Sequence, residues 1–188
     1  MEEENDIQNE TNHLDNDFEY HKSIQEPVQK PRKKEARDMA KKIIKELKIK
    51  EAPINLREVI SHIQKEFNLQ IIPNELSKNI SGMIVKITEI EEERFAIGFN
   101  TNDPWCRRRF TIGHEIGHLL FNTMCNKGSS EHKSIEQECE CFAAELLIPK
   151  TILKKDFAET PDIPELSKKY LVSAQAMGIK IMDDRLLK

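Results

Sequence analysis

Hydrophobic residues recur every three or four positions in two segments near the start of the chain, a spacing typical of amphipathic helices. Residues 36–49 predict the first helix. Its apolar stripe consists of Ala36, Met39, Ala40, Ile43, Ile44 and Leu47. Pro53 ends this helix, and Asn55 is the expected N-cap of a second helix over residues 56–67.

A different pattern follows, in which short runs rich in β-branched residues partly alternate with polar ones. Residues 69–73, 80–90 and 94–100 carry this pattern, and polar stretches separate them. The pattern predicts three strands of a small sheet. Residues 100–104, "NTNDP", then predict a turn that leads into a helix.

Helical spacing dominates the rest of the chain. One long helix is expected over residues 104–121 and a second over residues 131–148, which Pro149 ends. Two or three shorter helices are expected within residues 150–157 and 163–187. The residues expected to face the core in these shorter helices are Leu166, Tyr170, Ala174 and Met177. The chain therefore predicts an α+β fold that is mostly helical, with a small three-stranded sheet packed beside the first long helix.

Length and charge predict the domain organisation. A chain of 188 residues is long enough for one domain with a core. Residues 1–34 hold many acids, then the basic stretch "KPRKK", and few apolar residues, so we expect a disordered charged leader before a folded domain at residues 35–188. Glu35, Asp38 and Glu46 interrupt the basic stretch, so direct nucleic-acid binding is not expected.

The composition predicts a soluble, cytoplasmic protein without a membrane partner. Charged residues make up 33% of the chain, the formal net charge is −4, and the apolar runs are far shorter than the ~20 residues that cross a bilayer. The first residues lack the basic and apolar regions of a secretory signal. In a reducing compartment the cysteines are expected to be free thiols. They are Cys106, Cys125, Cys139 and Cys141.

The first long helix carries the candidate chemistry, in the segment "RRFTIGHEIGHLLF" (residues 108–121). His114 and His118 lie four residues apart, so their imidazoles share one helix face and can bind one ion at Zn–N distances of about 2.0–2.1 Å. Glu115 is rotated about 100° from His114 and could contact a metal-held water as a general base. The alternative is a buried helix in which both histidines are satisfied core groups.

Two glycines in the same segment favour a constrained packing arrangement. Gly113 and Gly117 each cost about 0.5–1 kcal/mol relative to alanine in a helix interior, so their presence needs a compensating reason. We explain both by the close approach of another backbone to this helix.

A catalytic zinc site needs a third protein ligand and an open position for water. The acids of the second long helix are the candidates: Glu136, Glu138 and Glu140. Glu136 and Glu140 share a helix face, whereas Glu138 is predicted to point toward solvent. We expect Glu136 to bind the metal and Glu140 to accept a hydrogen bond from a histidine N–H. Cys139 and Cys141 point about 200° apart on a helix and cannot share one ion.

These motifs resemble a known family. "RRRFTIGHEIGHLLF" followed by "IEQECECFAAELLIP" is similar to the ImmA/IrrE family of zinc metallopeptidases, in which an arginine-rich stretch precedes an HExxH helix and an acidic stretch runs into "FAAELLMP". The resemblance extends over residues 36–182. It implies Zn²⁺ bound by His114, His118 and Glu136, with Glu115 as the catalytic glutamate. At the positions of Cys139 and Glu140 the family commonly has a small residue followed by Asn or Asp.

The resemblance also implies a substrate class. Family members often relieve repression by cleaving or inactivating a helix-turn-helix repressor of a mobile element, phage or stress regulon. Some carry their own amino-terminal DNA-binding domain. Here only the charged leader occupies that place, so we expect the DNA-binding partner to be a separate protein.

Three functions are compatible with the sequence. The leading hypothesis is a zinc-dependent endopeptidase. The second is a regulatory module that docks to a repressor or toxin and keeps the zinc only for stability. The third is a hydrolase of small amides, which would have a deep pocket instead of an extended groove. The candidates for stabilising the oxyanion are Arg107, Arg109, His132 and Tyr170.

Overall fold

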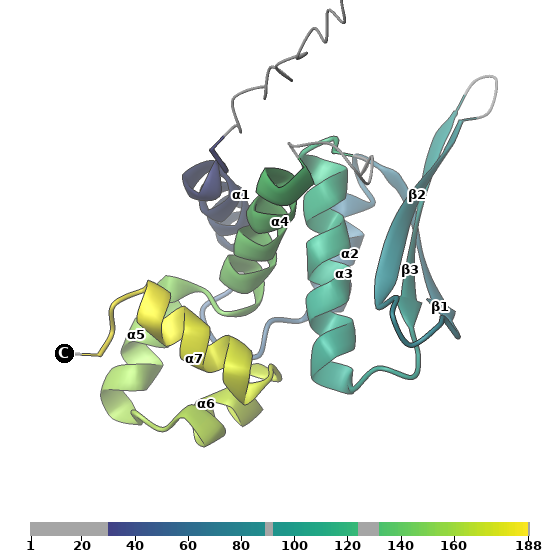
Figure 1. The fold of residues 1–188 in the computed structure, drawn as a ribbon. Helices are drawn as coiled ribbons and strands as arrows, with labels where there is room; N and C mark the ends of the chain where they lie inside the picture. The colour runs from purple at the N-terminus through teal and green to yellow at the C-terminus, as the bar shows by residue number, and fades with distance from the viewer. Residues whose placement is uncertain (1–29, 89–91, 124–131, 188) are drawn as a thin grey trace, which may run out of the picture.

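The computed structural model describes residues 30–88, 92–123 and 132–187. The described part has seven helices and one three-stranded sheet, which confirms the predicted α+β class (Figure 1). The helices are α1 (Lys33–Glu46), α2 (Leu56–Ile63), α3 (Trp105–Leu120), α4 (His132–Leu147), α5 (Lys150–Glu159), α6 (Ile163–Tyr170) and α7 (Ala174–Asp183). The strands are β1 (Asn68–Asn74), β2 (Gly82–Thr88) and β3 (Glu93–Asn100). Residues 1–29, most of the predicted charged leader, lie outside the described part.

The first two helices form where the apolar spacing predicts them, with shifted ends. α1 begins at Lys33, three residues early, and ends at Glu46 because Lys48 adopts a left-handed backbone conformation with φ 55°. The Asn55 side chain accepts a hydrogen bond from the Arg57 amide at 3.1 Å, which confirms the predicted N-cap of α2. α2 ends at Ile63, earlier than predicted, and the chain then turns into β1.

The sheet has the strand order β1-β3-β2, so β2 lies at one edge. β1 pairs with β3 in parallel and β2 pairs with β3 antiparallel. In this register Ile97 of β3 lies opposite both Ile71 and Ile84. Leu69, Phe95 and Ile97 are buried, and strands β2 and β3 contact α3. The sheet therefore packs beside α3, as predicted.

Helices α3 and α4 lie side by side at the centre of the molecule, with α1 packed against α4 and the sheet on the far side of α3 (Figure 1). α1 contributes the small buried residues Ala36 and Ala40 to this arrangement. The Arg109 guanidinium, on α3, is buried and donates to the Ile54 carbonyl at 2.8 Å, which ties α3 to the start of α2. The long helices are thus held on several sides.

The C-terminal helices α5, α6 and α7 pack below α4 (Figure 1). Leu166, Tyr170 and Met177 are buried, as predicted. Ala174 is exposed, so its predicted place in the core is wrong. The helical repeat restarts there, because Leu171 ends α6 with φ 55° and Ser173 caps the new helix α7.

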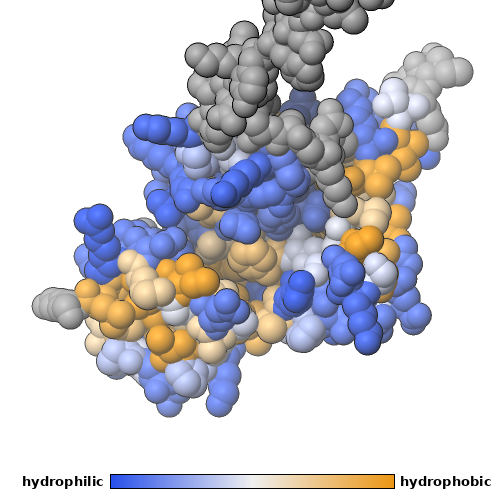
Figure 2. All heavy atoms as spheres, in the orientation of Figure 1, coloured by the Kyte–Doolittle hydropathy of each residue, from blue (hydrophilic) through white to orange (hydrophobic). Residues whose placement is uncertain are grey.

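Exposed apolar side chains gather on two parts of the surface in Figure 2. One part is over α7, where Ile179 and Met182 are exposed, and the other is over the sheet, where Met83 and Val85 are exposed. Hydrophilic residues gather in the upper part of the view, over the ends of α1 and α4. Within the described residues, each helix is too short or too polar to cross a membrane.

Candidate metal centre and catalytic site

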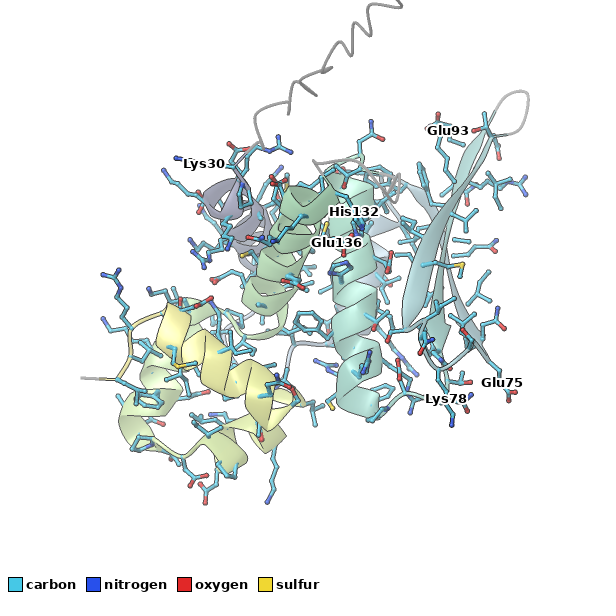
Figure 3. All side chains as sticks on the ribbon, in the orientation of Figure 1. Lys30, Glu75, Lys78, Glu93, His132 and Glu136 are labelled. Atoms are coloured by element: carbon cyan, nitrogen blue, oxygen red, sulfur yellow. The ribbon has the colours of Figure 1, made fainter. Side chains whose placement is uncertain are left out.

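The structure brings together the three side chains predicted to bind the metal. His114 and His118 lie on adjacent turns of α3, and their ring nitrogens meet the carboxylate of Glu136. Glu136 lies near the start of α4 and points toward α3 (Figure 3). The Nε2 atoms of His114 and His118 are 3.0 Å apart. Glu136 places Oε2 at 3.2 Å from the first and Oε1 at 3.3 Å from the second.

These distances suit a small divalent ion. A tetrahedral ion with ligand bonds of about 2.0–2.2 Å keeps its ligand atoms about 3.3–3.6 Å apart. The three observed separations are within a few tenths of an ångström of that edge length. Two imidazoles and one carboxylate are also a donor set that zinc accepts in catalytic sites with one open position. The residues present therefore fit the metal that the motif implies.

The tautomer of His118 is set by Thr123, which lies just beyond the end of α3. Nδ1 of His118 lies 3.1 Å from the backbone carbonyl oxygen of Thr123 and 3.3 Å from its hydroxyl oxygen. A carbonyl oxygen can only accept, so Nδ1 carries the proton and Nε2 presents its lone pair to Glu136 and His114. This is the tautomer that a metal ligand needs.

Both imidazoles are held in their neutral form. Burial lowers the pKa of His114, and the neighbouring His118 lowers it further, against the opposing effect of Glu136. Burial also lowers the pKa of His118. Neutral imidazole is the form that binds metals, so the surroundings prepare both side chains as ligands.

Glu115 lies beside this cluster and is buried between α3 and the sheet. Its side chain faces β2, where the Ile84 backbone amide donates a hydrogen bond to the carboxylate. Burial, helped by the negative charge of Glu136, nevertheless raises the pKa of Glu115 to about 7. A carboxyl group with a pKa near neutrality can both accept and return a proton, as a general base must.

A glycine allows β2 to come this close to α3. A side chain at Gly82 would collide with the Thr111 methyl group, and its Cβ would lie 2.8 Å from the Gly98 carbonyl oxygen. The same Cβ would stand 3.7 Å from Oε1 of Glu115. Gly82 therefore sets the spacing between the edge strand and α3.

The predicted close packing is confirmed at Gly117 but not at Gly113. A Cβ at Gly117 would lie 3.2 Å from Cα of Cys139 on α4, closer than such atoms normally pack. A Cβ at Gly113 would lie 3.4 Å from Cβ of Ala143, which is ordinary contact. The tight approach at Gly117 brings α4, and with it Glu136, within reach of the histidines.

Two predictions about the acids of α4 are wrong. Glu138 is buried, only 4% exposed, and its carboxylate receives the backbone N–H and the guanidinium of Arg32 at 2.8 and 3.1 Å. The packing of the segment before α1 against α4 covers the side that was expected to face solvent. Glu140 is exposed and lines a pocket with Lys33 and Arg37. Thr123 therefore takes the place expected for Glu140 beside a histidine nitrogen.

The metal cluster opens onto a shallow groove between α3 and the loop before β2. The lining residues are Asn79, Ile80, Ser81, Gly82, Arg107, Phe110, Thr111, His114 and Glu115. The loop is held by the buried Asn100 amide, which donates to the carbonyls of Leu76, Ser77 and Ile80. This shape is an open groove beside an edge strand.

The four oxyanion candidates separate by position. The buried Tyr170 hydroxyl, on α6, donates a hydrogen bond to Asp156 of α5 at 2.8 Å. The Arg109 guanidinium donates to the carbonyl of Ile54. Arg107 lies in the groove, where its Nε donates to the Ser81 hydroxyl at 2.9 Å. His132 lies beside Glu136, with its Nδ1 3.7 Å from Oε1 (Figure 3). Arg107 and His132 are the two candidates near the site.

Comparison with protein families matches residues 65–182 to the Peptidase_M78 family, described as the IrrE N-terminal-like domain. The chain belongs to this family. The match covers most of the chain, including both helices that form the metal cluster, and confirms the resemblance noted from the sequence motifs. Family membership supports a peptidase-type hydrolase. No curated protein matches the chain in a direct sequence comparison.

The sequence motifs did not predict some of the residues that shape this Peptidase_M78 site. The Ile84 amide acts through its backbone, which leaves no side-chain signal, and the role of Gly82 depends on how the sheet docks on α3. Thr123 could have been found, because a hydroxyl residue five positions after His118 and just past the helix end can fold back to the imidazole. Cys106 and Cys141 are free thiols, as expected, and Cys139 is buried on α4. Cys125 lies outside the described residues.

Proposed function

We propose that this protein is a zinc-dependent endopeptidase in which His114, His118 and Glu136 bind the metal and Glu115 is the general base. The observation that carries the proposal is a cluster in which the Nε2 atoms of His114 and His118 are 3.0 Å apart and each lies 3.2–3.3 Å from a carboxylate oxygen of Glu136. The buried carboxyl of Glu115 lies beside this cluster. Membership of the Peptidase_M78 family supports the same reaction class.

The residues have distinct roles in peptide hydrolysis. A bound zinc ion would activate water and polarise the scissile carbonyl. Glu115 takes a proton from the attacking water as the C–O bond forms, and returns a proton to the leaving nitrogen as the C–N bond breaks. Its pKa of about 7 suits both transfers near neutral pH. Arg107, already in the groove, is placed to contact the substrate backbone.

The shape of the site favours a polypeptide over a small amide. The groove is shallow and open, and β2, at the sheet edge, borders it. An extended peptide can add to the edge of a sheet through main-chain hydrogen bonds. Following the family resemblance, we propose a helix-turn-helix transcriptional repressor, bound as a separate protein in the cytoplasm, as the substrate.

The decisive experiment compares wild-type protein with Glu115→Gln, each loaded with Zn²⁺ and incubated with the repressor encoded beside it. The wild type is expected to produce a defined fragment, detected by mass spectrometry. The variant is expected to bind Zn²⁺ in full and to produce none, because glutamine keeps the shape of glutamate but cannot accept the proton. Equal cleavage by both proteins would remove Glu115 from the mechanism.

A matched control is Glu140→Gln, which neutralises an exposed carboxylate on α4 away from the groove. This variant should cleave like the wild type. If wild-type protein with Zn²⁺ binds the repressor tightly and leaves it intact, the endopeptidase proposal fails, and a regulatory binding module with a structural zinc becomes the better description.

A further inference from the structure

His132 begins α4, four residues before Glu136, and its imidazole lies beside the same carboxylate (Figure 3). Nδ1 of His132 is 3.7 Å from Oε1 of Glu136, which is longer than a hydrogen bond. Nδ1 is buried, and within the described residues it has no hydrogen-bond partner. Leaving a buried polar atom unsatisfied is unfavourable, so a partner within a small side-chain rotation is significant.

The two oxygens of Glu136 have different neighbours. Oε2 faces Nε2 of His114 at 3.2 Å, whereas Oε1 faces both Nε2 of His118, at 3.3 Å, and His132. A carboxylate that binds a metal through one oxygen leaves the other to accept a hydrogen bond, and such partners orient the ligand. A carboxylate that used both oxygens would occupy the coordination position needed for water.

We propose that His132 is a positioning residue, which donates from Nδ1 to Oε1 of Glu136 when the metal is bound and so leaves only Oε2 to the ion. The fourth coordination position then stays open. This inference rests on the metal centre of the proposed function, and it concerns how that centre is held. His132 touches neither the metal nor the substrate in this role.

The test measures metal binding in three variants. Zn²⁺ affinity is measured by competition with a chromogenic chelator, and coordination by the absorption spectrum of the Co²⁺-loaded protein. His132→Ala is expected to bind Zn²⁺ about 10–100-fold more weakly and to shift the Co²⁺ bands. His132→Asn should restore most of the affinity and the wild-type spectrum, because its side-chain amide nitrogen can donate from nearly the position of Nδ1.

His62→Ala is the matched control. His62 Nε2 lies 3.0 Å from Glu46 Oε2, so this change also removes a histidine from a histidine–glutamate pair, on α2 and away from the groove. It should leave Zn²⁺ binding unchanged. Thermal unfolding of each metal-free variant separates a lost fold from a lost contact, and the partial exposure of His132 favours folded variants.

Two results would overturn the proposal. Wild-type Zn²⁺ affinity in His132→Ala would show that the imidazole does not hold Glu136. Equal loss of affinity in His132→Asn and His132→Ala would indicate that the imidazole is itself a ligand and that the site is closed. Both results are read from metal binding alone. If the wild-type protein binds Zn²⁺ but cleaves nothing, the proposed function is contradicted. The metal-binding measurements on the His132 variants still test the role of His132 in that case.

Discussion

The carboxyl group of Glu115 is held in surroundings that oppose its charge. Its side chain is buried beside Glu136, and the pKa rises from 4.5, its ordinary value, to about 7 in the folded, metal-free protein. In the unfolded chain the group ionises near its ordinary pKa. The folded state therefore binds a proton more tightly than the unfolded state between these two values, and stability falls as the pH rises through this window.

The metal-free protein should show this penalty directly. With a chelator present, Glu115→Gln is expected to be more stable than the wild type above pH 7, by at most about 3 kcal/mol from a pKa difference of about 2.5 units. The difference should vanish near pH 4. Urea unfolding at several pH values measures it, with Glu140→Gln controlling for net charge. A constant difference across the range would contradict the environment described for Glu115.

At the residue scale, the sequence predicted which side chains form the cluster of His114, His118 and Glu136, but not the environment of the neighbouring residues. The spacing of His114 and His118 within one helix brings them together whatever the rest of the fold does. Glu136 followed from its place in the next helix and from the family resemblance. Glu138 was assigned the wrong environment, because its contact with Arg32 joins residues more than a hundred positions apart. Helical periodicity carries no information about such a partner.

At the scale of elements, the packing of α3 on α4 determines whether the metal ligands meet. The closest approach is at Gly117, where a Cβ would lie 3.2 Å from Cα and 3.3 Å from Cβ of Cys139. It would also lie 3.3 Å from Cδ1 of Phe142. Backbone atoms cannot swing aside as a side-chain tip can, so a side chain at Gly117 must push the two helices apart.

Gly117→Ala is therefore expected to destabilise the protein by up to about 2.5 kcal/mol, since overpacking costs about 1–3 kcal/mol and the gain in helix propensity returns about 0.5–1 kcal/mol. It should also weaken Zn²⁺ binding, because Glu136 moves away with α4. Gly178→Ala on α7 is the control: its Cβ would meet nothing closer than Ile163 Cδ1 at 3.9 Å, so it should be neutral or stabilising. Urea unfolding and chelator competition measure both effects. A Gly117→Ala protein as stable as Gly178→Ala would refute the tight packing.

The elements themselves were largely predictable, and their ends were less so. All three strands and both long helices form where the periodicity places them. The exceptions are at ends that depend on local backbone geometry. Lys48 and Leu171 both adopt the left-handed conformation without being glycine, so neither helix end carries the usual signal. The exposure of Ala174 follows from the second of these ends.

At the scale of the whole molecule, the arrangement of the helices and strands could not be predicted from the sequence. Strand order β1-β3-β2 places the last strand between the first two, and the parallel pairing of β1 with β3 depends on contacts far apart in the chain. This order puts β2 at the edge beside α3. The open groove is thus a property of topology, which alternating residues within single strands do not encode.

The C-terminal helices are joined to α4 by a buried group of charges that the sequence also did not reveal. Lys180 of α7 lies with its Nζ 2.6 Å from Oε2 of Glu145 and 2.9 Å from Oδ2 of Asp184. All three side chains are at most 4% exposed. The other carboxylate oxygen of Glu145 accepts the Lys150 backbone amide at 3.2 Å, where α5 begins. This group links three helices around the end of the helix that carries Glu136.

Removing the Lys180 ammonium group should destabilise the packing of α7 against α4. Lys180→Met leaves two buried carboxylates without their shared cation, and breaking a buried ion pair from one side costs about 3–5 kcal/mol. Lys180→Met combined with Glu145→Gln should recover part of that loss, because the amide keeps an acceptor for Lys150 without the charge. Arg37→Met is the control: it breaks a partly exposed pair between Arg37 of α1 and Asp183 of α7 and should cost less than about 1 kcal/mol. Urea unfolding of the four proteins measures these differences. Equal stability of Lys180→Met and Arg37→Met would mean that the buried charges contribute no more than a surface ion pair, and that apolar packing alone attaches α7 to α4.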